Sequence, residues 1–513
     1  MRSPLLLGTI ATALVALGSY GAGATRTRGG VMRELGLGHL TFGHGRALSD
    51  ITLTCGIVLL IAAWVLLGHE LTRGRAGLAT TRRATLAWSA PLLLSAPILS
   101  RDVYSYLMQG AMLRDGFDPY TEGAAVNPGP YLLEVSHDWR NTTTPYGPLH
   151  LGIGKLITTV VGDNVSAGIV AYKLLSLVGF ALIAYSVPRL ARRIGGNPTL
   201  AVWLGVTNPL MLLHLLGGMH NESVMVGLVC CGLYLCAGAR FFTPGIALIG
   251  LAVSLKATAA IALPFVVWMM YHRYRSSSAG LWARVGVFLA VGAWSVAVSF
   301  AVVNLITVVT GSSWGWVAEI SGNSKVVNPL AGPTLAADLA TPFIQLFDEN
   351  FPYNTALALT RAAGTVLMLA GLVATWVVFR PRGKATNRRA IMGATLAYAV
   401  AFVTNAVTLP WYYASVLSTA GTFHPPVLAK KLLVFASVFV GLAFTGGGNH
   451  RLYELWFVLL AAAAGWAAAV WVYPKAPDVT TPRRPSPGRG ESPRGHRDRA
   501  ARLPGGPAGS RPR

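Results

Sequence analysis

An aspartate directly follows an apolar run in this sequence, at Leu99-Ser100-Arg101-Asp102. The residues from Val103 onward have the spacing of an amphipathic helix. Asp102 is therefore either the N-cap of that helix or a carboxylate available for chemistry. In the second case it can take a proton from a hydroxyl group as a general base. Arg101, beside it, is a candidate for binding an anionic group.

Other polar residues stand where apolar runs end or turn. Asp118, in DGFDPY, is either a turn former or a second carboxylate. His220, Asn221 and Glu222 follow a long apolar run and either cap a helix or bind sugar hydroxyls. Lys256 lies between two short apolar arms that we expect to form a hairpin. It either extends to the membrane interface or stabilises a phosphate.

Trp411 and Tyr412, in LPWYY, suit either an interfacial aromatic belt or a stacking platform for a substrate. Arg361 and Lys173 lie about two turns inside apolar runs. A charge at that depth is costly unless it is paired or used in function. Each is therefore a second-rank candidate for contact with an anionic substrate, and a structural pairing explains each equally well.

The composition decides what kind of molecule positions these residues. Of 513 residues, 53% are hydrophobic and only 12% are charged, whereas soluble domains carry roughly 25% charged residues. A soluble enzyme and a disordered chain are both excluded, which leaves an integral membrane protein. The net charge is +23, but the basic residues form short clusters between apolar runs. This pattern is typical of cytoplasmic loops and does not indicate a nucleic-acid partner.

The apolar runs predict an all-α polytopic membrane protein with about 12–14 transmembrane helices. Two long outer loops, 101–148 and 309–351, are expected to carry interfacial helices, and the first has a net charge of −3. Segment 149–162 is expected to be interfacial or re-entrant. Residues 1–473 form the membrane domain, and 474–513 a basic, disordered cytoplasmic tail rich in Pro, Gly and Arg.

Five motifs occur in this order: SRDVYSYLMQGAMLRDGFDPY, TPYGPL, NPLMLLHLLGGMHNES, LAVSLKATAAIALPF and LPWYY. Together, over about 85–470, they resemble the actinobacterial polyprenol-phosphate-mannose-dependent α-(1→6)-mannopyranosyltransferases of the GT-C superfamily. The resemblance implies a GT-C type helical bundle and an inverting mechanism with a catalytic aspartate at Asp102. It also implies transfer of mannose from polyprenyl-phosphate mannose to a hydroxyl of a lipomannan-like or other glycolipid acceptor.

On this interpretation the active site faces the outside of the plasma membrane, and no cofactor or metal is expected. Two alternatives stay open: a transporter or flippase of lipid-linked sugar, and a protein O-mannosyltransferase. A non-catalytic assembly protein is a further rival. The candidate substrate-binding residues are Arg101, Tyr104, Asp118, Tyr146, His220, Asn221, Glu222, Lys256, Trp411 and Tyr412.

Overall fold

The computed structural model describes residues 2–238, 240–276, 278, 280–320 and 326–474. Within these ranges the chain forms helices and no strand, apart from one isolated bridge between Phe444 and His450. The prediction of an all-α protein is confirmed. The predicted tail falls almost wholly outside the described residues.

Six described helices are long and apolar enough to cross a membrane, which confirms a multi-pass membrane protein. Three of them, α12, α15 and α19, bury less than a third of their most apolar stretch within the chain, so most of their surface is available to lipid. The six are α1 (Arg2–Ala22), α3 (Gly43–Thr72), α7 (Val165–Arg193), α12 (Leu281–Thr310), α15 (Tyr353–Val378) and α19 (Leu455–Val472).

The predicted span 198–216 is not one helix. Helix α8 (Pro198–Gly205) ends shortly before Asn208, whose side chain accepts a bond from the backbone two residues on. The chain continues as a π-helix, η5 (Met211–Gly217), and then bends by 116° into α9 (Glu222–Cys236). This bend creates a turn at 218–221 inside the bundle.

The remaining predicted crossings are shorter or less apolar helices. With its 16 residues, α4 is about 24 Å long, less than the roughly 30 Å of a hydrocarbon core. Length and composition therefore support six or seven spans, fewer than the 12–14 expected. The shorter or less apolar helices are α4 (Leu78–Leu93), α10 (Phe242–Val253), α11 (Leu263–Tyr274), α16 (Thr386–Thr404), α17 (Ala414–Ala420) and α18 (Val427–Ala443).

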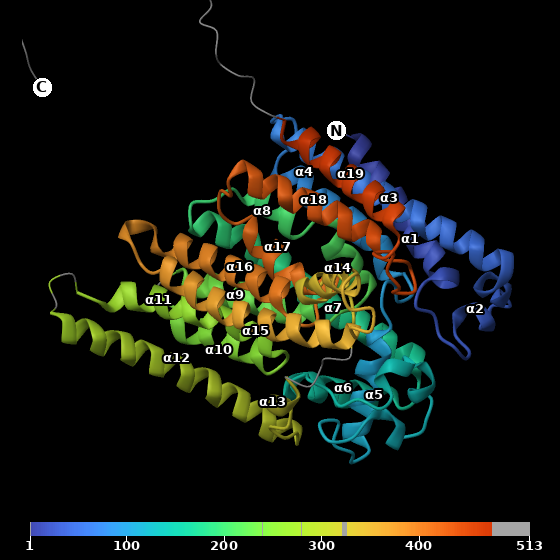
Figure 1. Ribbon diagram of the computed structural model, residues 1–513, viewed down its shortest axis with the longest axis horizontal. Coiled ribbons are helices and arrows are strands. Elements are labelled where there is room, and N and C mark those ends of the chain that lie inside the picture. The colour runs from blue at the N-terminus through green and yellow to red at the C-terminus, as the bar shows by residue number, and fades with distance from the viewer. Residues whose placement is uncertain (1, 239, 277, 279, 321–325, 475–513) are drawn as a thin grey trace, which may run out of the picture. The chain divides into compact units, whose positions relative to one another are not determined.

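The first outer loop contains α5 (Asp102–Arg114), which the sequence predicts to be an amphipathic helix on the membrane; in the structure it is enclosed by protein on most sides. Nine of its 13 residues are buried, because α6 (Pro148–Val161), α7 and the loop after α5 enclose it. Figure 1 shows α5 and α6 side by side. By contrast, α6 is two-faced as expected for 149–162: His150 is buried, whereas Leu156 and Val160 are exposed.

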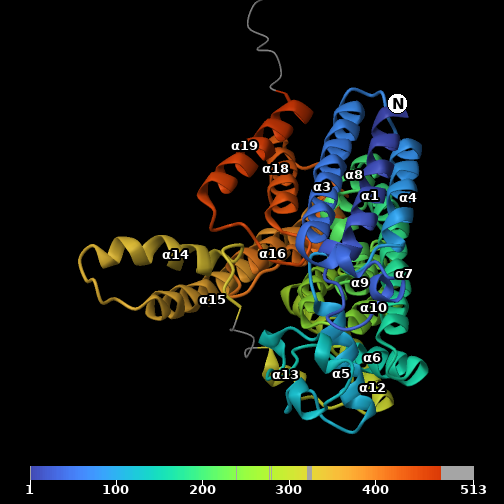
Figure 2. The same cartoon turned by 90° about the vertical axis from the view of Figure 1, so that its right-hand side faces the viewer.

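In the second outer loop, α14 packs along α15, and Figure 2 shows this pair extending away from α3 and α4. The loop helices are α13 (Trp316–Glu319) and α14 (Gly332–Gln345). The remaining short helices are α2 (Val31–Glu34), η1 (Gly38–Thr41), η2 (Ala124–Val126), η3 (Leu132–Glu134), η4 (His137–Trp139), η6 (Ala257–Ala262), η7 (Gly383–Ala385) and η8 (Pro410–Tyr413).

Two tryptophans join the N-terminal helices to the rest of the bundle. The rings of Trp64 in α3 and Trp203 in α8 stack with centroids 4.7 Å apart. Each indole N–H donates to the other residue's carbonyl, at 3.0 and 3.1 Å, so both buried donors are satisfied. This contact helps to fix the bend after α8 relative to α3.

Candidate active site

The backbone around Asp102 is held in an unusual conformation. Leu99 has φ +63°, a conformation that costs a residue with a side chain roughly 1–2 kcal/mol. Its N–H donates to the Gly446 carbonyl at 2.7 Å, and the Asp102 N–H donates to Ser100 Oγ at 3.1 Å. Asp102 is thus the first residue of α5 and not its N-cap. Such strain is typical of functional sites.

The Asp102 carboxylate points at two side chains. Its Oδ2 lies 3.3 Å from His220 Nδ1 and accepts a bond from the Tyr106 hydroxyl at 3.4 Å. Burial raises the pKa of Asp102, but His220, Ser100 and Lys256 outweigh that effect and hold the pKa below its ordinary value. The carboxylate is therefore ionised at neutral pH. Its side chain keeps 19% exposure, which leaves an approach for a second molecule.

His220 stands in the turn between η5 and α9. The preceding residue, Met219, is the second described non-glycine residue with positive φ, at +56°. The fully buried His220 ring stacks on Trp411 with centroids 3.5 Å apart. Because His220 is enclosed and Asp102 is partly open, a hydroxyl from outside reaches the carboxylate first. The geometry favours Asp102 as the base and His220 as the residue that orients it.

A buried ion pair lies within the same group of residues. Lys256 Nζ contacts Glu222 Oε1, lies 4.1 Å from the centre of the Tyr412 ring and 5.4 Å from that of Tyr146. Burial lowers the pKa of Lys256, but the charge of Glu222 and its neighbours more than compensates and raises it. The ammonium group is therefore retained. Lys256 is also a cation that the sequence predicts to stabilise a phosphate, and its charge helps to lower the pKa of Asp102.

The structure adds Tyr106 and His150, which the sequence analysis missed. His150 Nε2 lies 3.2 Å from Gln109, its Nδ1 lies 3.3 Å from the Asn221 amide, and its ring packs on Tyr106 and Tyr146. Burial, helped by Lys256, lowers the pKa of His150 to about 3, so the ring is neutral. Helical spacing was the available signal, since Tyr106 is four residues after Asp102.

Glycines allow the segments of this site to approach. A Cβ on Gly147 would lie 2.3 Å from the Ser254 carbonyl, and the Gly147 N–H donates to Leu255 at 3.1 Å. The TPYGPL segment is thereby fixed to the loop that carries Lys256. Gly110 and Gly154 similarly bring α5 and α6 into backbone contact. Residues from five separate parts of the chain converge as a result.

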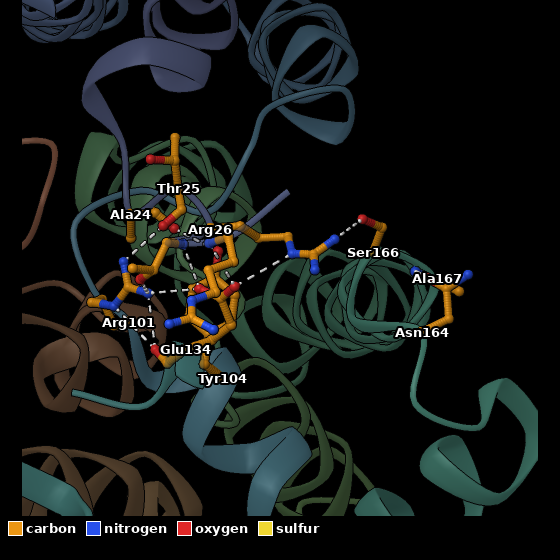
Figure 3. A network of polar contacts seen from close by, with 11 residues as sticks. Ala24, Thr25, Arg26, Arg101, Tyr104, Glu134, Asn164, Ser166 and Ala167 are labelled. Atoms are coloured by element: carbon orange, nitrogen blue, oxygen red, sulfur yellow. Dashed lines mark hydrogen bonds and ion pairs between the residues drawn. The ribbon is translucent and has the colours of Figure 1, made fainter. Parts of the chain in front are cut away.

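Three predicted substrate-binding residues, Arg101, Tyr104 and Asp118, lie apart from the residues around Asp102. Arg101 donates to the Thr25 carbonyl at 2.8 Å and pairs with Glu134, and the Tyr104 hydroxyl donates to Ala24 at 2.7 Å. Figure 3 shows both on the Glu134 side of α5. Asp118 accepts a bond from the Tyr120 N–H at 3.0 Å, which is the turn-forming role. Neighbours along a helix point to different faces, so adjacency to Asp102 did not place Arg101 beside it.

The two deep cations make structural contacts. Lys173 Nζ donates to Ser95 and to the carbonyls of Leu92, Leu216 and Gly217, at 2.9–3.4 Å. It thus binds carbonyls at the end of η5, where regular bonding stops. Arg361 donates to the Val326 carbonyl at 2.8 Å. Neither contacts the residues around Asp102 in these bonds.

This group, Asp102, Tyr106, Tyr146, His150, His220, Asn221, Glu222, Lys256, Trp411 and Tyr412, is hereafter the Asp102 cluster. It combines an ionised, partly open carboxylate with a retained ammonium group and several aromatic rings. The carboxylate suits proton removal, the ammonium suits a developing anion, and the rings suit the apolar face of a sugar.

Comparison with known proteins gives consistent results. Residues 5–272 match the family described as "Alpha-(1->6)-mannopyranosyltransferase, N-terminal domain", and residues 333–473 match "MptB C-terminal domain". The chain is 53% identical to alpha-(1->6)-mannopyranosyltransferase A of Corynebacterium glutamicum, over 92% of this chain and 99% of that protein. It is 38% identical to the A protein of Mycobacterium tuberculosis, over 93% and 90%. It is 30% identical to the B protein of C. glutamicum, over 79% and 70%.

Proposed function

Since the chain belongs to the alpha-(1→6)-mannopyranosyltransferase family, we propose that it transfers mannose from polyprenyl-phosphate mannose to a hydroxyl of a glycolipid or lipomannan-like acceptor. That it is a membrane glycosyltransferase is established by the family. The donor, the inversion of configuration, the α-1,6 linkage and the outer-face location are parts of the proposal. The observation that carries it is the Asp102 cluster, in which one partly open carboxylate lies near one buried ammonium.

The reaction needs a single displacement. The acceptor oxygen attacks the anomeric carbon of mannose while the bond from that carbon to the phosphate oxygen breaks, and its electron pair leaves with the phosphate. Asp102 takes the hydroxyl proton. Attack from the side opposite the phosphate converts a β-linked donor into an α-linked product. A second carboxylate, such as hydrolases use as a general acid, is not required because the phosphate leaves as an anion without being protonated.

Lys256 is the residue that we assign to the departing phosphate. The side chain is 10% exposed and faces Tyr412 and Tyr146, so its charge acts with little screening by water. His220 and Tyr106 hold the carboxylate in place for the acceptor. Trp411 supports His220 by stacking, and the aromatic rings are available to the sugar. Each of these assignments predicts a loss of transfer on substitution.

The test is transfer of labelled mannose from polyprenyl-phosphate mannose in membranes that contain the protein. We expect Asp102→Asn to remove transfer, because the amide accepts no proton, while the variant still inserts and folds. Asp138→Asn is the matched control, since Asp138 lies in the same loop and is exposed. Undiminished transfer by Asp102→Asn would refute the assignment of the base.

The outer-face location is tested separately by cysteine labelling in whole cells. In a variant without the native cysteines, Asp138→Cys should react with a membrane-impermeant maleimide. Arg382→Cys, in a basic loop expected to be cytoplasmic, should react only after the membrane is opened. The reverse pattern would place the Asp102 cluster on the cytoplasmic side and contradict the proposed donor access.

Of the rival interpretations, a transporter of lipid-linked sugar and a non-catalytic assembly protein are disfavoured by the transferase family. Protein O-mannosylation differs only in the acceptor. Supplying the same membranes with glycolipid and with peptide acceptors separates the two, and we expect label in the glycolipid fraction alone.

A further inference from the structure

A cavity lies on the side of α5 that carries Tyr104, and no residue of the Asp102 cluster lines it. It has a volume of about 740 Å³, within the usual range for small-ligand sites. Its walls come from the loop after α1, the end of α4, and the first turns of α7. We call it the α7 pocket.

The lining changes from polar to apolar along α7. At the start of α7, Ser166 accepts a hydrogen bond from Arg26 at 3.0 Å. Further along, Val170, Leu174 and Leu177 line the pocket, with Val170 and Leu174 each 59% exposed. From Ser166 to Leu177 the helix rises about 17 Å. A ligand of that length with a polar end and an apolar end fits this gradient.

The polar end carries positive charge. Arg26 and Arg33 line this end, and no acidic residue lines the pocket. Lys173 also lines it, but further along α7, where it is bonded to Ser95 and to backbone carbonyls. Glu134, just behind the wall, is 1% exposed and is bound by both Arg26 and Arg101 (Figure 3). Its single negative charge is thus already matched by two guanidinium groups. The excess positive charge favours an anionic group at this end.

The loop that forms this end is shaped for close approach. Gly29 and Gly30 both line the pocket and have φ of +71° and +89°. Glycine adopts such angles without steric cost. At these two positions a ligand meets backbone beside Arg26 and Arg33, while Val31, Met32 and Phe42 line the rest of the loop. Arg33 is exposed, so its side chain is free to close over a headgroup.

We propose that the α7 pocket binds an anionic phospholipid of the bilayer, with its phosphate at Arg26 and Arg33 and one acyl chain along Leu174. The site is separate from catalysis. Arg101 and Tyr104, on the pocket side, make the contacts with Glu134 and Ala24, whereas Asp102 and Tyr106 face the other way. A lipid held here therefore keeps its phosphate away from the base and is not the sugar donor.

The purified full-length protein is first equilibrated with vesicles of phosphatidylglycerol, of phosphatidylcholine, or of neutral lipid that contains polyprenyl phosphate. The lipid that stays bound to the protein is then measured by native mass spectrometry. We expect retention of phosphatidylglycerol above the other two. Equal retention of phosphatidylcholine would overturn the charge argument. Preferential retention of polyprenyl phosphate would overturn the phospholipid assignment in favour of a donor site.

Matched variants locate the binding. Leu174→Trp fills the pocket, whereas Val178→Trp alters an equally exposed position one turn further on that does not line it (59% and 58%). Arg33→Gln removes a lining charge, and Arg28→Gln an exposed charge from the same loop outside the lining. We expect at least about fivefold weaker retention for Arg33→Gln, the effect of one basic residue at a lipid surface. Equal losses in the control variants would overturn the proposal.

Discussion

Replacing His220 tests whether Asp102 is the proton acceptor. Three groups offset the burial of the carboxylate, and the His220 ring, 3.3 Å away, is the first of them. His220→Phe removes that contact and keeps an aromatic ring on Trp411. Burial then dominates, so the pKa of Asp102 rises. A hydrogen bond to a charged group contributes about 1.5–3 kcal/mol, and the ionised form of Asp102 loses stabilisation of that order in the variant.

The sign of the pH effect follows directly. Asp102 must be ionised to accept a proton, so transfer is lost as pH falls through its pKa. In His220→Phe this loss should begin at a higher pH than in the wild type. The assay is the pH dependence of kcat/KM for mannose transfer, because that quantity reports the pKa values of the free enzyme.

His214→Phe provides the control. His214 is also buried, packs against Trp411 with ring centroids 5.7 Å apart and lies 6.0 Å from His220. Its contacts do not include Asp102. We expect the acidic limb of its pH profile to match that of the wild type. If His220→Phe also leaves the acidic limb in place, the reasoning that His220 sets the charge state of Asp102 is wrong.

Three further predictions concern stability, measured as thermal unfolding of the purified protein in detergent. Lys256→Met should lower the free energy of unfolding by about 3–5 kcal/mol, because it leaves Glu222 charged and unpaired in the interior. Adding Glu222→Gln should restore much of that stability, and no recovery would argue against a coupled pair. Gly154→Val should destabilise the protein by about 1–3 kcal/mol, since its Cβ would lie 2.9 Å from Gly110 Cα. Gly162→Val is the control: its side chain would meet open space at φ +59°, so it measures backbone strain alone. Lys173→Met should lower the free energy of unfolding by about 1–3 kcal/mol, because the carbonyls that Lys173 binds lose their donor. An unchanged unfolding transition would contradict the structural role of Lys173.

The sequence predicted the parts of the site that depend on local order. Asp102 lies where an apolar run ends, and the chain there turns into α5 as expected. Lys256 lies between two short apolar helices, as the predicted hairpin requires. The turn after the run at 211–217 carries His220. In each case hydrophobic periodicity determined the element and its end.

Other features could not be read from local order. The pattern of α5 predicted an amphipathic helix, whereas the structure buries nine of its 13 residues against α6, α7 and the loop that follows it. Arg101 was grouped with Asp102 because the two are adjacent, yet Arg101 binds Thr25 and Glu134 whereas Asp102 contacts His220. His150 gave no signal by itself, since a lone histidine on an apolar helix is common in protein cores.

By itself, the sequence determined the class of the molecule, because 53% hydrophobic residues with 12% charged residues cannot cover a soluble surface. It also indicated the aspartate, through its position and the motifs around it. Only the tertiary structure decided which charges meet. The contact of Asp102 with His220 joins residues 118 positions apart, and that of Glu222 with Lys256 joins α9 to the loop before η6. Such contacts depend on how helices pack, and packing is set by the whole bundle rather than by any one segment.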